Sequence, residues 1–152
     1  MRTITFITFL AFITTASAET SIQDIKMQTN NYQTFYVNSS IEGAGTTSLL
    51  VDTGAGYSTI TEDTLEVLRK TGNAVYVKKL EGIMADGSRR VVSVYRISGM
   101  SLGGNCRVRN IEVAVFPAGS REILGLSALG KVAPFTFSMD PPVLSLSNCN
   151  RA

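Results

Sequence analysis

Apolar and β-branched residues along this chain occur in short runs that are separated by glycine, asparagine and aspartate. Runs of this kind are typical of the strands of an all-β domain. The pattern predicts seven strands, over residues 35–41, 46–51, 75–84, 89–97, 108–116, 135–138 and 143–146. No internal repeat interrupts them, so we expect one domain with one core.

One segment between these strands has helical signals instead. Thr61 can cap the first turn, Leu65 and Leu68 share one face, and Gly72 can end the helix. A second short helical turn is predicted over residues 126–129. We therefore expect a β domain with little helix.

Two of the predicted strands, residues 75–84 and 89–97, are joined by a segment that reads Ala-Asp-Gly-Ser. Asp-Gly between two apolar runs is a strong signal for a tight hairpin turn. The sequence therefore predicts a long hairpin with its tip near Asp86 and Gly87.

The N-terminus has the layout of a secretory signal peptide over residues 1–18. Arg2 precedes an apolar run over residues 4–13, and Ala16 and Ala18 precede the expected cleavage site. The alternative is a membrane anchor, but this run is too short to cross a bilayer. We expect an exported protein without a stable membrane anchor, and a bacterial periplasm as its compartment.

The rest of the chain, residues 19–152, divides into three segments by composition. Residues 19–30 are mostly polar and aperiodic, which predicts a linker; residues 31–148 form the domain, and residues 149–152 a tail.

Loss of the signal peptide removes one cation and no acid, so the net charge falls from 14 − 12 = +2 to 13 − 12 = +1. This small charge gives no reason to expect nucleic acid or an anionic membrane as a partner.

Cysteine and histidine usage narrows the chemistry further. Cys106 and Cys149 are the only cysteines, and export favours a disulfide between them, with two unpaired thiols as the alternative. The chain has no histidine. Ser-His-Asp and Cys-His catalysis within the chain and the commonest zinc sites are therefore excluded. Carboxylates are the natural candidates for unaided hydrolysis.

One carboxylate follows an apolar strand directly. The strand over residues 46–51 leads into Asp52-Thr53-Gly54-Ala55. Gly54 allows a close backbone approach, and Thr53 can lock the loop by hydrogen bonding. Taken alone, Asp-Thr-Gly is also compatible with an ordinary turn, because this tripeptide occurs by chance in roughly a few per cent of chains of this length.

Three elements in this order resemble the retropepsin-like aspartic proteases, including their bacterial single-domain members. The elements are Asp52-Thr53-Gly54-Ala55 after an apolar pair, the hairpin tip Met84-Ala85-Asp86-Gly87, and Ile123-Leu124-Gly125 before the second helical turn. The resemblance covers residues 36–146. It implies a closed acid-protease β-barrel with one short helix, which is half of a pepsin-like bilobal architecture.

The same resemblance implies roles for these residues. Asp52 would be catalytic, the rest of its motif would form the active-site loop, the hairpin tip would be a flap over the substrate, and Ile123-Leu124-Gly125 would be a second loop at the site. The reaction would be hydrolysis of peptide bonds in a peptide or protein substrate. It would need no metal and no organic cofactor.

A second carboxylate is not apparent within the chain. The other aspartates are Asp24 in the predicted linker, Asp63 in a helix, Asp86 at a hairpin tip and Asp140 before two prolines. Asp86 is the nearest rival, but a flap turn explains it better. The chain is also about half as long as the two-lobed members, so the resemblance implies a homodimer in which Asp52 of each copy forms the pair.

Two positions depart from the family pattern. Leu126 stands where viral members carry an arginine that braces the dimer, and Asp86 beside Gly87 replaces a glycine-rich tip. Two other interpretations stay open. One is a catalytically inactive, dimeric peptide-binding module of the same fold, and the other is an exported structural protein with an accidental Asp-Thr-Gly.

Overall fold

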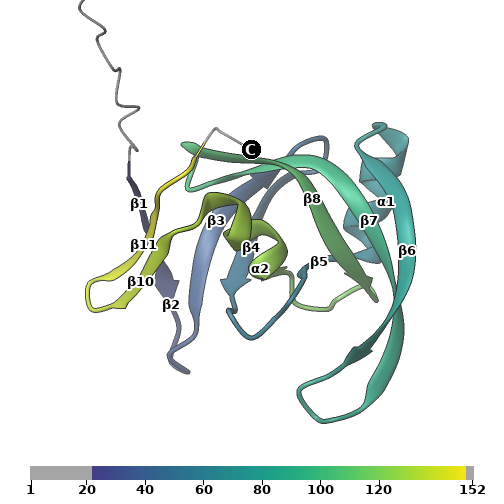
Figure 1. The fold of residues 1–152 in the computed structure, drawn as a ribbon, viewed down its shortest axis with the longest axis horizontal. Helices are drawn as coiled ribbons and strands as arrows, with labels where there is room; N and C mark the ends of the chain where they lie inside the picture. The colour runs from purple at the N-terminus through teal and green to yellow at the C-terminus, as the bar shows by residue number, and fades with distance from the viewer. Residues whose placement is uncertain (1–21, 150–152) are drawn as a thin grey trace, which may run out of the picture.

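Strands dominate the computed structural model, which describes residues 22–149 (Figure 1). In chain order the elements are β1 (Gln23–Lys26), β2 (Gln28–Thr29), β3 (Phe35–Ile41), β4 (Gly45–Val51), β5 (Ser58–Thr61), α1 (Glu62–Lys70), β6 (Ala74–Ile83), β7 (Arg89–Leu102), β8 (Cys106–Phe116), β9 (Ile123–Leu124), α2 (Leu126–Leu129), the 3-10 turn η1 (Gly130–Val132), β10 (Phe135–Met139) and β11 (Pro142–Leu146). The seven predicted strands and both predicted helical segments are present.

Six of the strands close a barrel. Their order is β3, β4, β9, β5, β8 and β7, and β7 returns to pair with β3. The pairs β3–β4 and β7–β8 are antiparallel, whereas β4–β9 and β5–β8 are parallel. Strands β2 and β6 extend this sheet at its two ends, and β1, β11 and β10 form a separate sheet beside it. This architecture confirms the predicted closed acid-protease barrel.

The alternation of side chains along β3 shows how the barrel is filled. Phe35, Val37 and Ile41 point into the core, while Asn38 and Ser40 face outward. This is the period-two pattern of a strand with one buried face. Each fully buried aliphatic side chain of this size contributes roughly 1.5–3 kcal/mol of hydrophobic stabilisation.

Strand β7 is longer than the sequence predicts, because it continues beyond Ile97 to Leu102. Gly99 lies inside this extension, at a position where a Cβ would come within 2.7 Å of the Val108 carbonyl oxygen. Glycine therefore marks a close approach of two backbones here rather than the end of a strand. Residues 100–102 are the part of β7 that pairs with β3 and closes the barrel.

The prediction of a linker over residues 19–30 is wrong where the structure describes it. Strand β1 pairs with β11 and β2 pairs with β3. Ile25 and Met27 are buried in the core, and Asp24 accepts a hydrogen bond of 2.6 Å from the Ser145 hydroxyl. The domain therefore begins before residue 31. Residues 19–21 and the predicted signal peptide, residues 1–18, lie outside the described residues.

The predicted disulfide between Cys106 and Cys149 is confirmed. The two Cα atoms are 4.7 Å apart, and both cysteines are buried. The bridge joins the start of β8 to the end of the described chain, so Cys149 belongs to the domain and not to a tail. Closing a loop of this span stabilises by roughly 4 kcal/mol in the chain-entropy description. Residues 150–152 lie outside the described residues.

None of the helices within residues 22–149 has the length and apolar character needed to span a bilayer.

Candidate active site

Asp52 is the first residue after β4, and neighbouring backbone groups orient its carboxylate. The Asp52 amide donates to the Leu124 carbonyl over 3.1 Å, which fixes the backbone. The Gly54 amide then donates to Asp52 Oδ1 over 2.9 Å. A Cβ on Gly54 would lie 3.2 Å from that oxygen, so glycine suits this close contact. One carboxylate oxygen is thereby held within the loop.

Thr53 behaves differently from the prediction that it locks this loop. Its side chain is exposed and forms no hydrogen bond with any other of residues 22–149. The turn is instead closed by the Ala55 amide, which donates to the Asp52 carbonyl over 3.3 Å. The Thr53 hydroxyl is left available to a group outside this part of the chain.

The predicted second loop lies directly against the first. Strand β9 pairs in parallel with the end of β4, which brings Gly125 beneath the Asp52 loop. A Cβ on Gly125 would come within 2.4 Å of the Tyr57 carbonyl oxygen and 2.7 Å of the Ala55 carbonyl oxygen. Only glycine permits this approach. The Leu126 amide completes the contact by donating to the Ala55 carbonyl over 2.9 Å.

Two serines, which the sequence analysis did not assign to the site, join the same loops. Ser58 is buried, and its hydroxyl oxygen accepts a hydrogen bond of 3.1 Å from the Gly125 amide. The Ser58 amide in turn donates to the Ser127 hydroxyl over 2.8 Å. Ser58 begins β5, and the sequence of that strand, Ser-Thr-Ile-Thr, has no pattern that marks this role. These bonds cross-link the β4–β5 loop to the start of α2.

Glu122 is a second residue that the sequence analysis missed. Its buried carboxylate accepts hydrogen bonds from the hydroxyls of Thr47, over 2.7 Å, and Thr64, over 2.6 Å. It also accepts one of 3.2 Å from the Thr61 amide at the N-terminus of α1, where a negative charge is favoured by the helix dipole. Glu122 thus ties β4, β9 and α1 together behind the loops. Its partners are far away in sequence, so no local pattern marks it.

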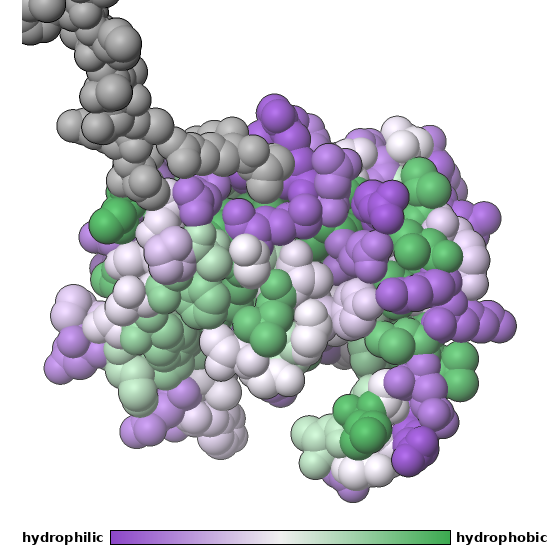
Figure 2. Space-filling model, viewed as in Figure 1, coloured by the Kyte–Doolittle hydropathy of each residue, from purple (hydrophilic) through white to green (hydrophobic). Residues whose placement is uncertain are grey.

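A groove of about 500 Å³ lies over Asp52 and under the β6–β7 hairpin. Figure 2 shows the corresponding hollow between the body of the domain and the hairpin at the lower right. The residues lining it are Asp52, Gly54, Ala55, Gly56, Tyr57, Thr59, Leu80, Gly82, Ile83, Met84, Ala85, Val92, Ala114, Phe116 and Ile123. Asp52 is the only carboxylate among these described residues. Of the predicted flap residues, Met84 and Ala85 line the groove, whereas Asp86 and Gly87 do not.

Asp86 and Gly87 form the tip of the hairpin. Gly87 has φ of +79°, which favours glycine, and its amide donates to the Met84 carbonyl over 2.9 Å. Hydrogen bonds from the Ser88 hydroxyl and amide hold the pKa of Asp86 below its usual value. The side chain of Ile83, next to the tip, is 71% exposed. The tip is therefore stabilised by its own short-range bonds and projects away from the core.

No second carboxylate from residues 22–149 joins Asp52. Asp24 lies on β1, Asp63 in α1 and Asp140 in the turn between β10 and β11, and none of them lines the groove. Within the same residues, no group of three or more acidic or cysteine side chains is arranged to hold a metal ion.

A closed acid-protease barrel with an Asp-Thr-Gly loop and an overhanging hairpin defines the class of retropepsin-like aspartic proteases. The family model described as gag-polyprotein putative aspartyl protease matches residues 37–131, and the chain belongs to this family. Among solved structures, it is similar to a retropepsin-like aspartic protease from Rickettsia conorii, with a TM-score of 0.58 and 22% identity over 83% of this chain and 91% of that one. A comparison with curated protein sequences finds no match.

Proposed function

We propose that this protein is an exported aspartic endopeptidase that is active as a homodimer, with Asp52 of each copy providing one carboxylate of the catalytic pair. The observation that carries the proposal is a substrate-sized groove lined by a single carboxylate. General acid and base catalysis of peptide hydrolysis by carboxylates uses two of them in different protonation states. A second copy related by two-fold symmetry supplies the missing group.

The surface beside Asp52 supports this arrangement. The exposed Thr53 hydroxyl is available to a partner, and the Leu126 side chain, which follows the second loop, is 43% exposed. An exposed leucine next to an active-site loop can bury apolar area against its symmetry mate. We infer that Leu126 makes an apolar contact where viral relatives use an arginine.

The chemistry follows from two carboxyl groups that share one proton, because two carboxyl groups that face each other at close range cannot both be ionised. The ionised carboxylate removes a proton from a water molecule, and the resulting hydroxide attacks the peptide carbonyl carbon. The protonated carboxyl group donates its proton to the carbonyl oxygen. The tetrahedral intermediate then collapses: the carboxyl group that took the proton from water gives it to the leaving amine, and a hydroxyl of the intermediate gives its proton to the other carboxylate, which restores one shared proton.

An extended peptide fits the walls of this groove. The floor carries the Asp52 loop, and the hairpin above contributes the apolar side chains of Leu80, Ile83 and Met84. Apolar walls around a few polar groups are typical of sites that bury a substrate and exclude water. We infer that the hairpin folds over the bound peptide as a flap.

The proposal of export rests on two features. The pattern over residues 1–18 is that of a cleavable signal peptide. The Cys106–Cys149 disulfide supports an oxidising compartment, because such bonds are rare in a reducing cytosol. A bacterial periplasm satisfies both.

The test compares the purified protein with Asp52→Asn on a mixture of peptides. The amide has nearly the same shape but cannot act as a base, so we expect cleavage to fall by at least about a thousandfold. Asp140→Asn is the matched control, because Asp140 is exposed and lies in a turn outside the groove. This control should cleave like the wild type.

Turnover by Asp52→Asn equal to that of the wild type would refute the assignment of Asp52. Binding of a pepstatin-type inhibitor and of peptides, without cleavage by any preparation of the wild type, would favour the alternative of an inactive peptide-binding module.

A further inference from the structure

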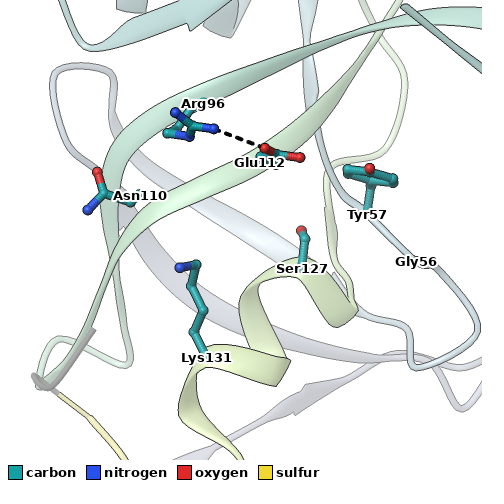
Figure 3. A pocket seen from close by; sticks show the side chains of 7 residues that line it. All are labelled: Gly56, Tyr57, Arg96, Asn110, Glu112, Ser127 and Lys131. Atoms are coloured by element: carbon teal, nitrogen blue, oxygen red, sulfur yellow. Dashed lines mark hydrogen bonds and ion pairs between the residues drawn. The ribbon is translucent and has the colours of Figure 1, made fainter. Parts of the chain in front are cut away.

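A second cleft adjoins the catalytic groove. It has a volume of about 680 Å³ and is lined by Gly56, Tyr57, Arg96, Asn110, Glu112, Ser127 and Lys131 (Figure 3). Gly56 and Tyr57 also line the groove over Asp52, so the two hollows share a wall. A peptide that leaves the groove past these two residues enters the second cleft.

The charges in this cleft do not balance. Glu112 pairs with Arg96 over 3.2 Å and with Lys78 over 4.0 Å. Lys131 extends from the helical side of the cleft toward the strands that carry Arg96 and Glu112 (Figure 3). No acidic side chain among residues 22–149 pairs with Lys131. The residues that line the cleft include two cations, Arg96 and Lys131, and one anion, Glu112, which leaves a local charge of 2 − 1 = +1.

Lys78 adds a further positive charge next to the wall that the two hollows share. Its ammonium group lies 5.6 Å from the centre of the Tyr57 ring. The Tyr57 side chain raises the pKa of Lys78 above its ordinary value, with a smaller contribution from the Glu112 charge in the same direction. Lys78 is therefore protonated throughout the neutral pH range. It lines neither hollow, but it lies beside Tyr57, which lines both.

We propose that this cleft is a specificity site for an acidic side chain of the peptide substrate, with Lys131 as its main recognition residue. The proposal rests on the proposed function, because it takes the groove over Asp52 as the path of the peptide. The side-chain amide of Asn110 and the hydroxyl of Ser127 are further donors for a carboxylate in the same cleft.

A single carboxylate fits this cleft better than a polyanion does. Glu112 stands among the cations and repels a group that carries more negative charge. The net charge of the whole chain is only +2, so no extended positive surface attracts a longer anion. Because a two-fold dimer has two such clefts, acidic residues should be preferred on both sides of the scissile bond at matching distances.

The experiment uses a library of blocked octapeptides in which each position is fixed in turn as Glu or as Gln. Cleavage by the wild type and equilibrium binding to Asp52→Asn are both measured, because binding does not require turnover. At the best position we expect about a fivefold preference for Glu over Gln, which falls toward one in about 1 M salt.

Three variants assign the preference to the cleft. Lys131→Gln should remove most of the preference, and Lys131→Arg should restore it because the charge returns. Lys79→Gln is the matched control, because Lys79 is an exposed lysine on β6 that lines neither hollow. This control should keep the full preference.

The outcomes separate the two proposals. Cleavage that depends on Asp52 but shows no preference for Glu, or a preference that survives in Lys131→Gln, overturns the specificity site and leaves the protease intact. A preference for Glu in binding with no cleavage supports the site and contradicts the protease. A folded protein that neither binds nor cleaves any library peptide overturns both.

Discussion

The floor and the roof of the groove over Asp52 are built in opposite ways. In the floor, buried polar groups of two loops bond to each other, as Ser58 does with Gly125 and Ser127. In the roof, the β6–β7 hairpin extends beyond the core, and Ile83 is 71% exposed. The floor is densely cross-linked, whereas the hairpin tip is held by bonds within its own turn.

This difference matches what the proposed function requires of each part. A catalytic carboxylate needs a fixed position, because a small displacement from the reacting atoms costs much of the rate. A flap has to open and close around the substrate, so it is drawn from a region with few buried contacts. Changes in the floor should therefore reduce stability and activity together, and changes in the roof should affect activity alone.

Among the changes that test this contrast between floor and roof, the largest effect is expected for Gly125→Ala. The new methyl group would meet the carbonyl oxygens of Tyr57 and Ala55, so the two loops must separate. We expect cleavage to fall by about a hundredfold or more, and stability by roughly 3 kcal/mol. Peptide turnover and urea unfolding at one fixed protein concentration measure both quantities.

Gly130→Ala is the matched control for that substitution. Gly130 has helical dihedral angles, and a Cβ there meets no atom within 4 Å. It should leave both quantities near the wild-type values. Equal turnover and equal stability of the two variants would show that the close contact at Gly125 contributes to neither activity nor folding.

The next largest effect is expected for Glu122→Gln. The amide keeps the size of the side chain but places a donor against the donors of Thr47, Thr61 and Thr64. We expect a loss of roughly 2 kcal/mol in the free energy of unfolding. Glu66→Gln removes an ion pair with Lys70 that is exposed and screened by solvent, so it should leave the free energy of unfolding nearly unchanged. Similar losses in the two variants would contradict a structural role for the buried carboxylate.

The smallest effect is expected in the roof, for Ile83→Ala. Ile83 lines the groove but is mostly exposed, so its loss removes contact with the substrate and little from the core. We expect kcat/KM to fall by about tenfold while the melting temperature stays the same. Val75→Ala, at the other end of β6 and 65% exposed, should change neither. A clear drop in melting temperature for Ile83→Ala would remove the contrast between roof and floor.

The sequence predicted those parts of the fold that depend on local patterns. Strand β3 and helix α2 have the predicted boundaries, because β3 alternates buried and exposed residues and α2 is flanked by Gly125 and Gly130. The position of the hairpin tip followed from Asp-Gly. The loop motif also identified Asp52 as the groove carboxylate, since an apolar strand that ends in a carboxylate leaves it at the surface of the barrel.

The missed features depend on partners that are distant in sequence. The polar segment that holds β1 has two buried apolar residues, Ile25 in the strand and Met27 just after it, and the partner strand β11 lies at the other end of the domain. The extension of β7 depends on a close approach at Gly99 that is visible only in three dimensions. Glu122 bonds to threonines 58 to 75 residues away, so its burial has no local signature.

The central claim is that each active site needs Asp52 from two chains, and mixing the wild type with Asp52→Asn tests it most directly. The two proteins are combined at constant total concentration and incubated until activity is constant. If subunits pair at random, an equal mixture should retain about a quarter of the wild-type activity, because only dimers of two wild-type chains are active. Sedimentation at the assay concentration should show a dimer. Retention of about half the activity, together with a monomer in sedimentation, would contradict the shared site and require a second carboxylate within the chain.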